Sequence, residues 1–253
     1  MNKFIKFCLR LALILAIIGI VSIIAVFAMG LSWNQLKEMA RNGEFMIDID
    51  DSREESSSVS NDGCDKLDIE CSAGTVFIFY DDVDEIKVEQ QGINNFSCDI
   101  NGDTLRISGG KKIFGNNSIG EITIRVPKGY VFKEVDLEIG AGQADVDGLY
   151  AEELDVEVGA GQVVLKNIDV IHMNAKASAG QIQAELVGCM EDYNCDIECG
   201  VGEILIGDNS YGGLGKESQI ENPGAHRELD IECSVGQIVI EFQETTLGGH
   251  HHV

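Results

Sequence analysis

Residues 154–165 read LDVEVGAGQVVL, and this stretch decides the fold. Leu154, Val156 and Val158 alternate with acidic residues, which is the period-two pattern of a β-strand with one buried face. Gly-Ala-Gly interrupts the pattern, and alternation resumes at Val163 with a changed phase. The stretch therefore predicts two strands joined by a tight corner.

The same template recurs along the chain at short spacing. The corner glycines from Gly142 to Gly236 are 19, 19, 22 and 34 residues apart. A short repeat of this kind is typical of a solenoid, in which each coil buries its apolar face only by stacking on its neighbours. We therefore expect an all-β protein, a single-stack β-solenoid, with a β-sandwich as the alternative. The copies begin at Leu67, Val135, Leu154, Met173, Cys195 and Leu229 and end at Gly74, Gly142, Gly161, Gly180, Gly202 and Gly236.

The corner itself has a predicted geometry. In each copy the residue before the glycine is Ala or Val, such as Ala160, and the next apolar residue follows three positions later. We expect this small residue to point inward where the two sheets meet. Glycine would then allow unusual backbone angles or the close approach of a neighbouring coil.

The repeat domain is expected to span residues 61–245. Its N-terminal part is less regular, because the first two corner glycines are 68 residues apart. Period-two segments nevertheless predict strands there, and Pro127-Lys128-Gly129 marks a turn after the last of them. These segments are at residues 86–88, 99–100, 105–107 and 121–126.

An apolar run of 21 residues without a charge covers residues 11–31. It is long enough to cross a hydrocarbon core of ~30 Å as a helix. Lys3, Lys6 and Arg10 precede it, so the positive-inside rule predicts a cytoplasmic N-terminus and a domain outside the cytoplasm. We expect residues 1–33 to form a cytoplasmic stub and a single-pass transmembrane helix in the cell membrane. A cleaved signal peptide is the alternative.

Two further segments are not expected to belong to the repeat domain. Residues 34–60 are acidic and serine-rich towards their end, which predicts a flexible spacer. Residues 246–253 are predicted to be a flexible tail. His250, His251 and His252 in that tail are a candidate for binding a transition metal, with a functionless terminus as the alternative.

The chain is strongly acidic, with a formal net charge of −25. Such a surface repels nucleic-acid phosphates, so we expect no nucleic-acid partner. On the repeats, acidic residues occupy the outward positions of successive coils and predict two columns of like charges, which Ca²⁺ would relieve. Lys176 interrupts the columns, and we expect it between Glu157 and Glu198; a solvated acidic face without a metal is the competing interpretation. The candidate cation-facing residues are Asp136, Glu138, Asp155, Glu157, Asp196, Glu198, Asp230 and Glu232.

Two other residue types recur at fixed positions. A glutamine follows the corner glycine in four copies, and we expect these amides to form a ladder along the stack, with sugar binding as the alternative. Cysteine recurs at one inward position, where it is explained as a small buried hydrophobe. Cys199 and Cys233 are nevertheless expected one coil apart, close enough for a disulfide. The glutamines are Gln143, Gln162, Gln181 and Gln237, and the recurring cysteines are Cys71, Cys199 and Cys233.

On these residues the chain resembles the putative adhesin domain family, bacterial domains of unknown function built from β-strand repeats. The resemblance rests on the Glu121–Pro127 strand, the Val135–Gly142 strand and the Gly-Gln corners, and it covers roughly residues 61–245. It implies a β-solenoid, often behind a transmembrane segment and sometimes associated with envelope-stress regulation. It implies no catalytic residues.

No phosphate loop, nucleophile elbow or zinc-hydrolase signature occurs in the sequence. We therefore expect a non-catalytic binding, adhesion or scaffold module of a bacterial cell envelope, without a cofactor and with an unidentified protein or envelope partner. Envelope-stress sensing through a partner protein is the alternative, and a polysaccharide-acting enzyme is a third. We also expect end-to-end self-association, because residues 243–253 are too short and polar to cover the last coil.

Overall fold

The computed structural model describes residues 55–59, 63–110 and 120–243. These residues form strands and one short 3₁₀ helix, η1 (Met190–Asp192). No helix in this part of the chain is long and apolar enough to span a membrane, and the expected span at residues 11–31 lies outside it. The all-β repeat fold predicted from the alternation is confirmed.

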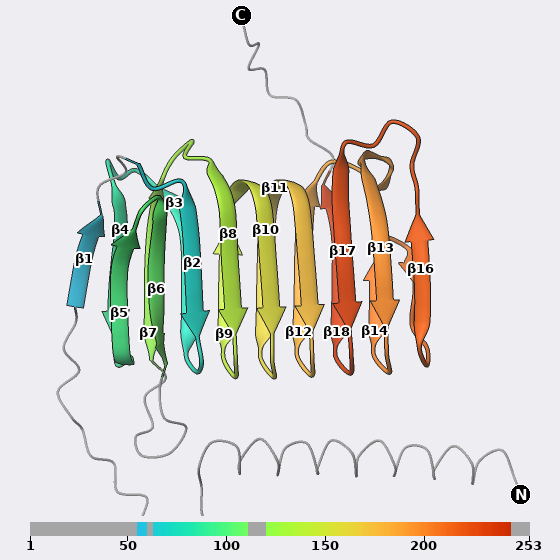
Figure 1. Ribbon diagram of the computed structural model, residues 1–253, viewed down its shortest axis with the longest axis horizontal. Helices are drawn as coiled ribbons and strands as arrows, with labels where there is room; N and C mark the ends of the chain where they lie inside the picture. The colour runs from blue at the N-terminus through green and yellow to red at the C-terminus, as the bar shows by residue number, and fades with distance from the viewer. Residues whose placement is uncertain (1–54, 60–62, 111–119, 244–253) are drawn as a thin grey trace, which may run out of the picture. The chain divides into compact units, whose positions relative to one another are not determined.

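The strands lie in two sheets that face each other across an apolar core (Figure 1). A long strand, β11 (Gln162–Ala177), contributes its first half to sheet A and its second half to sheet B. In spatial order, sheet B contains β5 (Asn94–Asn101), β6 (Thr104–Gly110), β2 (Lys66–Cys71), β8 (Phe132–Ile139), β10 (Tyr150–Val158), β11, β17 (Arg227–Cys233), β13 (Tyr193–Cys199) and β16 (Lys216–Ile220).

Sheet A has the same stacking direction. In spatial order it contains β1 (Glu55–Val59), β4 (Ile86–Gln91), β7 (Glu121–Pro127), β3 (Thr75–Asp81), β9 (Gln143–Asp147), β11, β12 (Gln181–Val187), β18 (Gln237–Gln243), β14 (Glu203–Ile206) and β15 (Asn209–Ser210). We call a sheet B strand, its corner and the following sheet A strand a coil.

The coils do not stack in the order of the sequence. The coil β2–β3 lies between β8–β9 on one side and β6 with β7 on the other. At the opposite end, β17–β18 lies between β11–β12 and β13–β14. The colours of Figure 1 show both exchanges, with β2 inside the green strands and β17 before β13.

The core is made by the alternation that the sequence predicted. Leu154, Val156 and Val158 of β10, and then Val163 and Leu165 of β11, are at most 2% exposed. Burying an aliphatic side chain of this size contributes about 1.5–3 kcal/mol, so each coil stabilises the stack through its inward side chains. The equivalent positions of the other coils are buried in the same way.

The expected inward position before the corner glycine is wrong in five of the six copies. Only Ala73 is buried, at 9% exposed. The next buried side chain after Val158 is that of Val163, and the residues between them form a turn at the surface. The residue at the apex instead holds the stack by its backbone, as Ala160 N donates to Gly140 O at 2.7 Å. The exposed members are Ala141, Ala160, Ala179, Val201 and Val235.

Both ends of the stack carry antiparallel strands. At one end β4 pairs with β7, β1 pairs with β4, and β5 pairs with β6. The strand β1 falls inside residues 34–60, so the strand region begins before residue 61. At the other end β16 pairs with β13, so part of the glycine-rich segment after Ser210 is an edge strand.

These end strands bear on the predicted end-to-end self-association. The last coil in the sequence, β17–β18, is internal and is covered by β13–β14. The edge strand β16 places Lys216 opposite the buried Cys199, and the Lys216 ammonium lies 5.5 Å from the Tyr211 ring centre. An inward-directed charge on an edge strand disfavours pairing with another chain. End-to-end association stays a prediction, but an uncovered last coil does not support it.

Candidate functional site

The corner glycines form one column along the stack. The residue after each glycine donates its backbone N–H to the neighbouring corner, as in Gln162 N to Gly142 O at 3.0 Å and Gln237 N to Gly180 O at 3.1 Å. A Cβ added to Gly161 would lie 2.2 Å from Gly142 O, and one added to Gly236 would lie 1.9 Å from Gly180 O. Close approach of two backbones therefore requires glycine here. In spatial order the column is Gly74, Gly142, Gly161, Gly180, Gly236 and Gly202.

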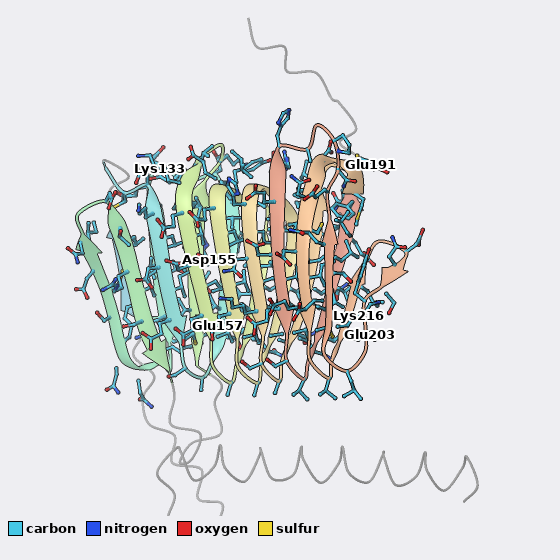
Figure 2. All side chains as sticks on the ribbon, turned by 45° about the vertical axis from the view of Figure 1, so that its right-hand side comes forward. Lys133, Asp155, Glu157, Glu191, Glu203 and Lys216 are labelled. Atoms are coloured by element: carbon cyan, nitrogen blue, oxygen red, sulfur yellow. The ribbon has the colours of Figure 1, made fainter. Side chains whose placement is uncertain are left out.

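The outer face of sheet B carries the acidic residues in two adjacent columns. Figure 2 labels Asp155 and Glu157, which stand on this face, one in each column. We call this surface the acidic face. Its first column is Arg106, Asp68, Asp136, Asp155, Asn174, Asp230, Asp196 and Gln219, and its second is Ser108, Glu70, Glu138, Glu157, Lys176, Glu232, Glu198 and Glu217.

The register corrects the expected neighbours of Lys176. Lys176 lies between Glu157 and Glu232, not between Glu157 and Glu198, because β17 is inserted before β13. Within the described residues Lys176 makes no direct ion pair with either carboxylate. In this order Glu198 lies between Glu232 and Glu217, and it has no lysine beside it in its column.

Like charges in register perturb the titration of the acidic face. Partial burial, followed by the charges of Asp155, Glu134 and Asp68, raises the pKa of Asp136 to about 6. Burial and then the charges of Glu70 and Glu157 raise the pKa of Glu138. At neutral pH the face therefore carries repulsion that a cationic partner would relieve.

Some of the charge is neutralised at one border of the face. Arg106 Nε lies 2.7 Å from Asp68 Oδ2, and Lys66 Nζ lies 2.7 Å from Glu134 Oε2. A shallow hollow of about 380 Å³ opens beside this border, over the centre of the face. Its lining includes Asp68, Asp136, Glu138, Asp155, Glu157 and Lys176.

A second hollow of about 570 Å³ lies on the same face near β13 and β17. Asp196 and Asp230 line it from the strands, and the loop Glu221–Ala225 borders it. Burial and then the charges of Asp196 and Glu228 raise the pKa of Asp230. Asn222 fixes the loop by donating its Nδ2 to Tyr193 O at 2.7 Å. Sequence patterns did not predict this hollow, since it depends on where the loop folds back.

The columns do not converge on a metal-binding geometry. In the part of the chain that the structure describes, no group of three or more His, Cys, Asp or Glu side chains is arranged to hold a metal ion. Adjacent strands place one carboxylate beside the next along a flat face, whereas Ca²⁺ takes six to eight oxygens around a point. The histidines of the tail lie outside the described residues.

The outer face of sheet A has a different composition. Its glutamine column runs Gln143, Gln162, Gln181, Gln237 and ends at Glu203. Gln237 Nε2 donates to Glu203 Oε2 at 3.0 Å, but among the described residues no hydrogen bond joins the side-chain amides of the other three. The glutamines thus align as predicted, but in the described residues the hydrogen bond of this column joins an amide to a carboxylate and not two amides.

A family model and solved structures are similar to this chain. The model of the Toastrack DUF4097 family matches residues 64–249. A crystal structure described as a putative cell adhesion protein from Clostridium sporogenes is 18% identical, with a TM-score of 0.52, and the match covers 76% of this chain and 100% of that one. At this identity the likeness concerns the fold alone.

The likeness to a second solved structure is weaker. A putative adhesin from Bacteroides fragilis is 13% identical over 74% of this chain and 97% of its own, with a TM-score of 0.35. The search of curated proteins found no match. The resemblance inferred from the Gly-Gln corners is nevertheless confirmed, because the family model covers all six repeat copies: the chain belongs to the Toastrack DUF4097 family.

Proposed function

We propose that the chain is a membrane-anchored, extracytoplasmic and non-catalytic adhesion module of a bacterial cell envelope, and that its acidic face contacts a basic partner. The observation that carries this proposal is the charge of that face. Asp136, Asp155, Glu138 and Glu157 form two adjacent like-charged pairs across β8 and β10. The apolar run at residues 11–31 supports the membrane anchor, and the description of the similar Clostridium sporogenes structure as a putative cell adhesion protein agrees with a binding role.

The acidic face suits a basic partner for a physical reason. Two unit charges at strand spacing repel by about 1 kcal/mol in water and by more near a protein surface. A partner that brings Lys or Arg side chains to the face replaces this repulsion with attraction. Such electrostatic matching raises association rates and selects against acidic partners. A flat, rigid sheet suits contact with a macromolecule better than enclosure of a small substrate.

The experiment compares variants of the full chain expressed on bacterial cells. Glu138→Gln with Glu157→Gln removes one like-charged pair from the acidic face. Glu185→Gln with Glu241→Gln is the matched control, because those residues form an adjacent pair on sheet A. We expect the first variant to lower binding to a polylysine-coated surface about threefold at low salt, and the control to leave it nearly unchanged.

An equal loss in both variants would show that only net charge matters and would overturn the assignment to the acidic face. Deletion of the whole chain tests the module itself. If deletion changes the envelope-stress response and leaves adhesion unchanged, the regulatory alternative replaces adhesion.

A further inference from the structure

Two buried cysteines face each other on neighbouring strands. Cys199 of β13 and Cys233 of β17 are direct register partners, and they are 2% and 0% exposed. Strands in a sheet lie about 4.8 Å apart. This spacing falls within the Cα separation of about 4.4–6.8 Å at which disulfides form.

The positions of the two sulfur atoms strengthen the pairing. A Cβ added to Gly202 would lie 2.5 Å from Cys233 Sγ, so this sulfur packs against the corner of the coil that carries Cys199. Burial, followed by the charge of the neighbouring Cys199 thiol, raises the pKa of Cys233. Both thiols thus point into the same part of the core.

A third cysteine on β13 provides an internal comparison. Cys195 is also 2% exposed, but its register partner on β17 is Leu229. Burial and strand therefore do not distinguish Cys195 from Cys199. The residue opposite each of them on β17 does distinguish them, because Cys199 has a thiol opposite it and Cys195 has a leucine.

We propose that Cys199 and Cys233 form an intrachain disulfide when the chain folds outside the cytoplasm. The oxidant is a small-molecule disulfide, or an oxidoreductase that carries one. One cysteine thiolate attacks the oxidant's disulfide and releases one thiol. The second cysteine thiolate then attacks the mixed disulfide, forms the protein S–S bond and releases the other thiol. The two cysteines lose two electrons and two protons in total, and one oxidant disulfide becomes two thiols.

The bond would form before the coil closes, because thiols buried in an apolar core exchange slowly. It would then join the inserted coil β17–β18 to β13–β14. The chain between the two cysteines includes β14, the two-residue β15 and the edge strand β16. Within the described residues β16 pairs only with β13. The cross-link would therefore stabilise an end of the stack at which the edge strand has a single pairing partner.

The test uses the full chain in detergent, refolded with glutathione disulfide and then alkylated in denaturant. We expect an intact-mass loss of two hydrogens and a peptide linking Cys199 to Cys233 in a digest made without reductant. Cys195→Ser is expected to keep the cross-link, and Cys199→Ser to abolish it. Linkages spread over Cys195 and other cysteines, or alkylation of both Cys199 and Cys233, would overturn the proposal.

A thermal measurement gives a second readout. Oxidation is expected to raise the melting temperature of the wild type and of Cys195→Ser by roughly 8 °C, and to leave Cys199→Ser unchanged. If Cys199→Ser does not fold, peptide mapping of the wild type still decides the pairing. An equal shift in the wild type and in a folded Cys199→Ser variant would also contradict it.

Discussion

The corner column and the acidic face belong to the same repeat but obey different constraints. Gly161 and Glu157 are four residues apart, yet Gly161 tolerates no side chain because a Cβ would meet the Gly142 carbonyl. The acidic face, in contrast, accepts Asn174 and Lys176 in one coil without a change of register. The corner is fixed by contact between backbones, whereas the face is free to vary in charge.

This difference indicates what each region contributes. The corner stabilises the stack through backbone hydrogen bonds such as Gln162 N to Gly142 O. The acidic face opposes stacking, since its carboxylates repel across neighbouring strands. Repeated acidity on a face that does not need it for folding therefore supports a role in binding rather than in stability.

The largest expected effect comes from filling the corner. Gly236→Ala should lower the free energy of unfolding by about 3 kcal/mol, because the new methyl group would overlap the Gly180 carbonyl and force the two coils apart. Urea unfolding followed by circular dichroism measures the change. Gly212→Ala is the control, since its Cβ would meet its nearest neighbour at an ordinary 3.6 Å. Equal losses at both positions would contradict a special role for the corner.

Neutralising Asp136 at the centre of the acidic face should raise the free energy of unfolding, which is opposite to the effect of filling the corner. The pKa of Asp136 is raised from 3.8 to about 6, so the native state binds more protons than the unfolded state between these values. The free energy of unfolding should therefore fall as the pH rises from about 4 to 6. Asp136→Asn should remove the contribution of Asp136 to this fall and add about 1 kcal/mol at pH 7, allowing for its partial exposure.

The pH series on wild type and variant measures that effect, and Asp208→Asn in an exposed turn is the control. A decrease in stability on Asp136→Asn would show that the carboxylate has a stabilising partner.

A smaller effect on stability is expected from Lys176, the one cation in the second column of the acidic face. Lys176→Gln removes a positive charge between Glu157 and Glu232 and should cost about 0.5 kcal/mol at low salt, with no loss at 1 M salt. Thermal melts at both salt concentrations provide the measurement. Lys87→Gln on sheet A should not destabilise, because Lys87 lies beside Arg125. A loss independent of salt would place the contribution of Lys176 in packing instead.

The smallest effect is expected at the corner apex. Ala160→Ser should change the free energy of unfolding by less than about 0.5 kcal/mol, because this side chain is exposed. Ala175→Ser, at a fully buried position, should cost about 1–3 kcal/mol for burying a hydroxyl group. Chemical denaturation of both variants makes the comparison, and a large loss at Ala160 would restore the inward orientation first expected from the sequence.

The sequence by itself determined the coil, its two faces and its corner. Strict alternation assigned Leu154 to the core and Asp155 to the surface, since successive side chains of a strand point to opposite sides. The corner glycine revealed close backbone approach, although not that Ala160 would turn outward. A local pattern cannot separate an inward corner residue from an exposed apex, because both allow the alternation to resume at Val163.

Only the tertiary structure decided the order of the coils. The template is nearly the same in β13 and β17, so either strand matches the register of β11 and local sequence does not select between them. That choice gave Lys176 the neighbour Glu232 and placed Glu198 between two carboxylates, Glu232 and Glu217. The sequence shows which charged residues each coil carries. Which of them lie side by side depends on pairing between strands that are far apart in the chain.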